Sequence, residues 1–185
     1  LARQGAMETI KALEYGAFDF VTKPASFSEL KSDSFRNKII DRLEAALFGA
    51  DYGSVLSKER SIEANSIEKT GKTGFRKSHG SRKLVALCCS TGGPKALHSV
   101  IPKLSKRLDA PFVLVQHMPA GFTKSLADRL DEMSDIRVKE AEDQDVLEKG
   151  VVYIAKGGCQ MRVIKTPDGI YRLSVTVEAG RNGLK

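Results

Sequence analysis

The feature that most constrains the fold is an alternation of short apolar runs with helical stretches after residue 83. LVALCC (84–89) and PFVLVQ (111–116) have the length and continuous apolar character of buried strands, and a stretch with helical periodicity follows each of them. IRVKEA (136–141) and VVYIA (151–155) are two further strand candidates. Strands that alternate with helices pack as a parallel sheet. We therefore expect an α/β unit with a mostly parallel sheet and helices on both faces.

Other segments have simpler patterns. MRVIK (161–165) and IYRLSVTV (170–177) flank the turn sequence TPDG, which predicts an antiparallel hairpin. Before the α/β unit, residues 5–15 and 35–48 have apolar residues at helical spacing. FDFV (18–21) has the composition of a short strand. We expect a linker from about residue 49 to residue 82, because that region is rich in Gly, Ser and Lys.

Composition excludes several classes of protein. No apolar run approaches the ~20 residues that a membrane helix needs, so we expect no membrane insertion. The three cysteines lack CxxC spacing, which argues against a zinc site or a disulfide framework and fits a cytoplasmic protein. The net charge of +7 comes largely from KTGKTGFRKSHGSRK (69–83), which has six basic residues and no acidic one. We interpret this stretch as a solvated linker and expect no nucleic acid partner. The first residue is Leu1 rather than Met, as expected for an internal fragment.

The candidate chemistry lies where two predicted strands end. Ser90 follows the first strand and His117 follows the second. Because the carboxyl ends of neighbouring parallel strands meet at one edge of the sheet, about 4.8 Å apart, a nucleophile–base pair is possible there. The glycine-rich turn after Ser90 leaves backbone N–H groups free, that of Thr91 among them, which suits an oxyanion hole. The alternative is an ordinary helix start beside a structural histidine.

The remaining candidates are weaker. We expect structural or solvated roles for both other histidines, packing roles for the two strand-end cysteines, and a solvated turn rather than a metal site for the acidic pair. These residues are His79, His98, Cys88, Cys89, Asp143 and Asp145.

Three segments resemble one known family. They are CSTGGPKAL (89–97), VLVQHMPAGFTKSLADRLDEMSDIRVKEAEDQD (113–145) and GVVYIAKGGCQM (150–161), and they are similar to the catalytic domain of the CheB-type chemotaxis protein-glutamate methylesterases. QHMPAGFT (116–123) is highly specific to that family. ALEYGAFDFVTKP (12–24) resembles the end of a response-regulator receiver domain.

The resemblance implies a division of the chain into three parts. Residues 1–34 would be the C-terminal end of a receiver domain, and residues 35–82 a helical and basic linker. Residues 83–185 would be the N-terminal part of a Rossmann-like methylesterase domain that is truncated at its C-terminus. Receiver, linker and hydrolase in this order is the arrangement that the family uses.

The resemblance also implies an activity. Ser90 would be the nucleophile, His117 its general base and the Thr91 backbone part of the oxyanion hole. The reactions would be hydrolysis of glutamyl methyl esters and deamidation of glutamines on methyl-accepting chemoreceptors, without a cofactor. A chemotaxis histidine kinase would phosphorylate the complete protein. Lys23 would contact the phosphoryl group, and Mg²⁺ is expected only for the missing part of the receiver.

The chain also departs from the family pattern. The third member of the triad, an aspartate, is expected outside this chain, so we expect the 185-residue chain alone to be inactive and poorly stable. Cys88, Lys156 and Gln160 stand where the family usually has Gly, Pro and His. The main alternative is therefore a regulatory or docking module with a degenerate hydrolase domain. A DNA-binding response regulator fits less well, because no helix-turn-helix pattern follows the linker.

Overall fold

The computed structural model describes the backbone of residues 2–63 and 83–178, and the side chains of residues 5–48 and 83–178. The chain divides into two compact units. One comprises Leu1–Phe20 and Arg82–Lys185, and the other comprises Val21–Ser81. Each unit is described by itself. The predicted boundaries at residues 34 and 82 stay predictions, and most of the predicted basic linker lies outside the described residues.

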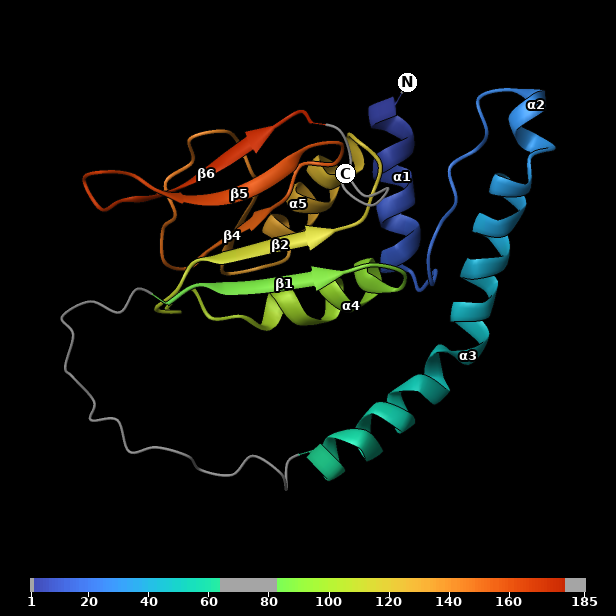
Figure 1. Cartoon of the computed structure of the whole chain (residues 1–185), viewed down its shortest axis with the longest axis horizontal. Coiled ribbons are helices and arrows are strands. Elements are labelled where there is room, and N and C mark those ends of the chain that lie inside the picture. Colours follow the sequence, from blue (N-terminus) through green and yellow to red (C-terminus); the bar gives the residue numbers. More distant parts are fainter. Residues whose placement is uncertain (1, 64–82, 179–185) are drawn as a thin grey trace. The chain divides into compact units, whose positions relative to one another are not determined.

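A four-stranded parallel sheet forms the centre of the first unit (Figure 1). Its strands, in spatial order, are β1 (Val85–Cys89), β2 (Phe112–Gln116), β4 (Val151–Ile154) and β3 (Arg137–Glu140). All three pairings are parallel. The four strands expected from the apolar runs and the mostly parallel α/β sheet are thus confirmed.

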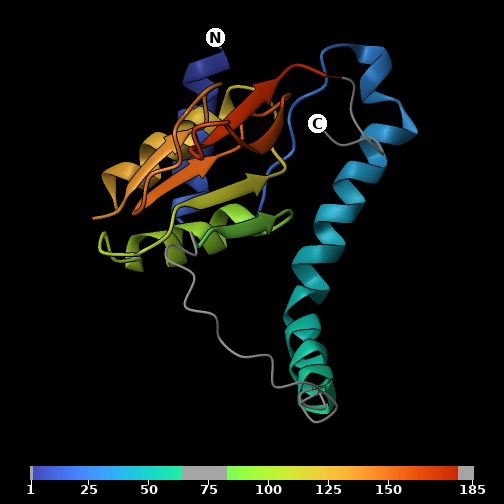
Figure 2. The same cartoon turned by 60° about the vertical axis from the view of Figure 1, so that its left-hand side comes forward.

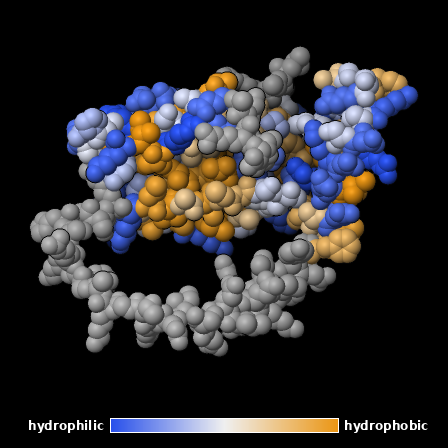
Figure 3. Space-filling view, in the orientation of Figure 1, coloured by the Kyte–Doolittle hydropathy of each residue, from blue (hydrophilic) through white to orange (hydrophobic). Residues whose placement is uncertain are grey.

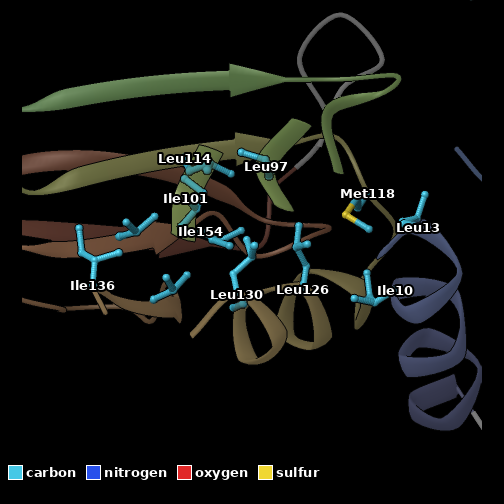
Figure 4. Packing of buried hydrophobic residues seen from close by; sticks show 13 residues of the cluster. Ile10, Leu13, Leu97, Ile101, Leu114, Met118, Leu126, Leu130, Ile136 and Ile154 are labelled. Carbon is cyan, nitrogen blue, oxygen red and sulfur yellow. The ribbon is translucent and has the colours of Figure 1, made fainter. Parts of the chain in front are cut away.

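Two helices connect these strands on one face of the sheet. α4 (Gly93–Val100) with the short 3-10 helix η1 (Ile101–Lys103) joins β1 to β2, and α5 (Phe122–Glu132) joins β2 to β3. Both connections advance in the same direction across the sheet, so right-handed crossovers place both helices on the same face. Figure 4 shows the resulting core, with helix side chains packed against strand side chains. Labelled members are Leu97, Ile101, Leu114, Leu126, Leu130 and Ile154.

A hairpin covers part of the opposite face. β5 (Gln160–Lys165) and β6 (Tyr171–Thr176) pair antiparallel, as the sequence predicts. Leu173 of the hairpin is fully buried in a cluster with Val113 and Tyr153 of the sheet. We expected helices on both faces, but in the described part this face has the hairpin. The physical reason is that the chain turns back from the edge strand β3 to β4 through residues 141–150, and this connection forms no helix.

The N-terminal helix belongs to the same unit. α1 (Ala2–Glu14) agrees with the predicted helix, and it buries Ile10 and Leu13 in the helical side of the core (Figure 4). The strand expected at residues 18–21 is wrong, because no strand of the described part lies beside this segment to pair with it. Instead, Phe20 stacks on Phe122 with ring centroids 5.0 Å apart.

The second unit is helical. α2 (Phe27–Leu30) begins at the N-cap Ser26, whose hydroxyl accepts from Glu29 N–H, while the Glu29 carboxylate accepts from the N–H of Ala25, one residue before the cap. α3 (Asp33–Glu63) confirms the helix predicted at 35–48 and continues into the predicted linker, because no proline interrupts it (Figure 2). Within the described ranges, no helix combines the length and the apolar character needed to span a bilayer.

Candidate active site

Ser90 and His117 are neighbours at the carboxyl edge of the sheet. The parallel register pairs Cys89 with Gln116, the last residues of β1 and β2, so the next residue on each strand is Ser90 and His117. The His117 N–H donates to the Cys89 carbonyl at 3.2 Å, which extends the ladder by one bond. Both side chains are exposed. The structure therefore places the two predicted residues side by side on adjacent strands.

The turn after Ser90 presents two backbone donors. The Gly93 N–H donates to the Ser90 carbonyl at 2.8 Å, and Gly92 has φ 73°, a left-handed conformation that glycine adopts without strain. No side chain caps the start of α4. Within the described part of the chain, neither the Thr91 nor the Gly92 N–H donates a hydrogen bond. Such unpaired donors suit a developing oxyanion.

Gly93 allows the close approach that closes this turn. A Cβ atom at residue 93 would lie 2.1 Å from Gln116 Oε1 and 2.6 Å from the Cys89 Cβ. Real Cβ atoms essentially never approach other atoms so closely. The start of α4 thus packs directly against the last residues of β1 and β2. This close packing fixes the position of Ser90, which lies between β1 and α4.

The side chains of Ser90 and His117 are not joined. Among the described residues, no hydrogen bond links Ser90 Oγ to the His117 ring, and no carboxylate binds that ring. Lys23 is exposed and lies in the second unit, which is described separately. The backbone therefore brings Ser90, Thr91 and His117 together, whereas no described acid orients the imidazole.

Gln116 is a residue of this site that the sequence analysis missed. It is 5% exposed at the end of β2, and its Nε2 donates to the carbonyls of Ser90 (3.0 Å) and His117 (3.4 Å). The signal was present in the apolar run VLVQ, because strand alternation puts Gln116 on the same buried face as Leu114. A buried polar side chain at that position requires a polar partner.

Buried contacts of Thr123 and Gly157 fix the loop after His117. Thr123 is fully buried, donates to Glu140 Oε1 at 2.6 Å and accepts from the Gly157 N–H at 3.0 Å. Gly157 itself packs so closely on the carbonyls of Met118 and Pro119 that a Cβ would lie 2.8 Å from each. These contacts join the ends of β2, β3 and β4 and define the path of the chain beyond His117.

Two aromatic residues from the N-terminal segment lie at the same edge. A Cβ at Gly92 would be 3.3 Å from the Phe18 ring, and Phe20 stacks on Phe122 at the start of α5. The segment after α1 therefore contacts the turn that follows Ser90 and the helix that follows His117. The sequence analysis expected a strand at this position and so gave no indication of this contact.

The weaker candidates have structural surroundings. Cys88 is exposed, whereas burial and the neighbouring Cys88 raise the pKa of the Cys89 thiol. Asp143 accepts from the Val175 N–H at 2.9 Å, which lowers its pKa, and Asp145 pairs with Lys139 at 2.8 Å. In the part of the chain that the structure describes, no cluster of three or more His, Cys, Asp or Glu residues is suited to hold a metal ion.

Comparison with known proteins gives a consistent result. The family model described as CheB methylesterase matches residues 85–182, which is more than half of the chain. The chain is also similar to a solved structure, the CheB methylesterase catalytic domain of Thermotoga maritima. The two share 44% sequence identity with a TM-score of 0.54, over 57% of this chain and 56% of that one.

Two similar relatives are named protein-glutamate methylesterase/protein-glutamine glutaminase. The protein from Bacillus subtilis is 45% identical over 163 residues, which cover 88% of this chain and 46% of the relative. The protein from Pyrococcus horikoshii is 40% identical over 181 residues, which cover 98% of this chain and 45% of the relative. The chain thus spans less than half the length of these curated relatives.

Proposed function

Because the chain belongs to the CheB methylesterase family, we propose that the complete protein hydrolyses glutamyl methyl esters, and deamidates glutamines, on chemoreceptors. The observation that supports this proposal most strongly is the pairing of Ser90 and His117 at the ends of two hydrogen-bonded strands, beside the free Thr91 N–H. Nucleophile, base and oxyanion donor are the three groups that acyl transfer through serine requires.

In this mechanism, Ser90 Oγ attacks the ester carbonyl while His117 accepts the hydroxyl proton. The oxygen that becomes negative accepts a hydrogen bond from the Thr91 N–H. His117 then gives the proton to the departing methoxide, which leaves as methanol, and an acyl-serine remains. Water, deprotonated by His117, attacks the acyl group, and the proton returns to Ser90 as the glutamate is released. With a glutamine substrate, the first leaving group is ammonia.

We also propose that the hydrolysis needs no cofactor, since Ser90 and His117 supply the nucleophile and the base. The acid that orients the His117 ring would come from a part of the longer protein that this chain does not contain. A Mg²⁺ ion would belong to the acidic pocket of the receiver domain, with Lys23 contacting the phosphoryl group that a chemotaxis histidine kinase supplies. The expected location is the cytoplasm, where the receptor helices carry their methyl esters.

The proposed regulation has a physical basis in the N-terminal segment. Phe18 lies against Gly92, and Phe20 is stacked on Phe122, so this segment occupies space beside the Ser90 turn. A change in the receiver part that withdrew the segment would alter access to Ser90. This observation supports a response-regulator role for the N-terminal residues.

The test is methanol release from methylated chemoreceptor by the complete protein. We expect Ser90→Ala to lower turnover by at least ~10⁴-fold, as removal of the nucleophile does in other triads. Ser99→Ala is the matched control, because Ser99 is an exposed serine of α4 whose hydroxyl, among the described residues, bonds only to the Lys95 carbonyl. A serine-directed fluorophosphonate probe should label the wild type and the Ser99 variant but not the Ser90 variant. Absence of labelling in the wild type would favour a non-catalytic docking module instead.

A further inference from the structure

Gln116 makes contacts that a packing residue would not need. Its amide nitrogen lies 3.0 Å from the Ser90 carbonyl and 3.4 Å from the His117 carbonyl. Since carbonyl oxygens only accept hydrogen bonds, the NH₂ end of the amide must face them. One buried side chain therefore bonds to the backbone of both residues on which the proposed hydrolysis depends.

These bonds determine the direction of a third group. The Ser90 carbonyl accepts twice, from Gly93 N–H at 2.8 Å and from Gln116 Nε2. The Ser90 carbonyl and the Thr91 N–H belong to the same planar trans peptide, in which C=O and N–H point in opposite directions. Holding the carbonyl toward Gln116 consequently turns the Thr91 N–H away from the protein interior, where it has no partner among the described residues.

The other end of the Gln116 amide has no partner. Oε1 is buried without a hydrogen bond in the described part of the chain, and it occupies the space beside Gly93 where a Cβ would lie. An unpaired buried acceptor is destabilising, and an apolar side chain of the same shape would avoid it. The donor end, by contrast, makes two hydrogen bonds, both of which an apolar side chain would lose.

We infer that Gln116 is a positioning residue that fixes the Ser90–Thr91 peptide, and thereby aims the Thr91 N–H at the oxyanion, while tying that peptide to the His117 backbone. The inference rests on the proposed hydrolase function. It predicts a specific kinetic signature, because an oxyanion donor acts on the transition state and little on the bound ester.

The first test is Gln116→Met in the complete protein. Methionine fills a similar volume and donates no hydrogen bond. We expect kcat for methanol release to fall about 10²-fold, the loss that a small misplacement at a reacting centre causes, with KM nearly unchanged. The affinity for a peptide whose glutamyl ester is replaced by a trifluoromethyl ketone, which forms the tetrahedral oxyanion, should fall by a similar factor. The thermal midpoint should not decrease in parallel.

The second test is Gln116→Glu, which keeps the side-chain size and gives a pH signature. A carboxylate cannot donate to the two carbonyls, whereas the protonated acid donates through its O–H. Burial among carbonyl oxygens raises the pKa of a carboxyl at this position. We therefore expect the ratio of variant to wild-type kcat to rise as the pH falls, while the same ratio for Gln116→Met stays flat. Val115→Ala, on the exposed side of β2, controls for disturbance of the strand.

The outcomes separate cleanly. Wild-type kcat in Gln116→Met overturns the inference, as does a loss that disappears after correction for the folded fraction. If Gln116→Met does not fold, Gln116→Glu decides, and a pH-independent ratio counts against the inference. Failure of the proposed function looks different, because Ser90→Ala would then retain methanol release, and this inference would fall with it.

Discussion

At Gly93, atoms of β1 and β2 leave no space for a Cβ atom. The neighbouring atoms belong to Gln116 and Cys89, and both residues are held in the sheet by the register of β1 and β2. Neither atom is the free end of a solvated side chain. The turn that presents Ser90 therefore requires a residue without a Cβ at position 93, and glycine is the residue that meets this requirement.

Gly93→Ala tests this reading at the residue scale. The new Cβ should displace the Gln116 amide and lower stability by roughly 1–3 kcal/mol, the usual range for overpacking. Urea denaturation of the chain measures this change in the free energy of unfolding. Gly5→Ala is the matched control: nothing lies within 4 Å of its Cβ position on α1, and the same substitution there should be neutral or stabilising. Equal stability changes in both variants would contradict the argument.

At the scale of elements, α1 is joined to the α/β unit by charge as well as by packing. Arg129 of α5 binds Glu14 of α1 through two hydrogen bonds of 2.9 and 2.6 Å, and it also pairs with Glu132. The hydrogen bond from Arg129 lowers the pKa of Glu14. His98 of α4 lies near both groups, and neither of its buried ring nitrogens has a hydrogen-bond partner in the described part of the chain.

His98 should make this packing sensitive to pH. Burial lowers its pKa from 6.5, with opposing contributions from Glu14, which raises it, and Arg129, which lowers it. Below pH 6.5, the His98 ring is therefore protonated more readily in the unfolded state than in the folded state. Stability should be full above pH 6.5 and decrease as the pH falls from 6.5 toward the lower folded pKa. Glu14 and Arg129 keep their charges in this window, because their pKa values are shifted down from 4.5 and up, respectively.

Thermal denaturation of the chain between pH 7.5 and about 5 measures the effect. His98→Gln removes the titration while retaining a polar side chain of similar length, so its midpoint should depend less on pH across this window. Identical pH profiles for the wild type and this variant would show that His98 does not contribute.

At the scale of the whole molecule, one face of the sheet near β1 is apolar, and no helix or strand of the described residues covers it. Figure 3 shows this apolar surface. Strand alternation puts Ala86 of β1 and Val115 of β2 on this face, and both are exposed. Cys88 pairs with Val115 in the register, and both are exposed on the same side. Contiguous apolar surface of this kind is uncommon on monomeric soluble proteins.

The 185-residue chain on its own should therefore bind an apolar dye such as ANS and associate in solution. The complete protein, at about twice this length if it resembles its relatives, should do so much less. Dye fluorescence and size-exclusion chromatography at matched concentration measure the difference. The isolated chain should also release no detectable methanol from methylated receptor, and measurable release by the chain would refute this expectation.

How far the sequence predicts this architecture depends on the range of the interactions involved. Apolar periodicity is local, so it located the four parallel strands, the hairpin and α1 within a few residues. Pairing is not local, and residues 18–21 have the composition of a strand yet find no partner among the described strands. The same limit applies to the site. The proximity of Ser90 and His117 can be predicted because each follows the end of a strand. The two hydrogen bonds that Gln116 donates to their carbonyls become visible only when β1 and β2 are side by side.

The strand order has a consequence for synthesis. β3 is made before β4, yet within the described sheet it pairs only with β4, which lies between β3 and β2. Between the emergence of Glu140 and that of Val151 from the ribosome, β3 has no partner strand in this sheet, and α5 is the earlier element that it contacts most. Its hydrogen bonds with β4 can be complete only after Ile154 has emerged. The growing chain therefore passes through a stage with an open edge on β2 and an unpaired β3, a vulnerable stage for a nascent chain.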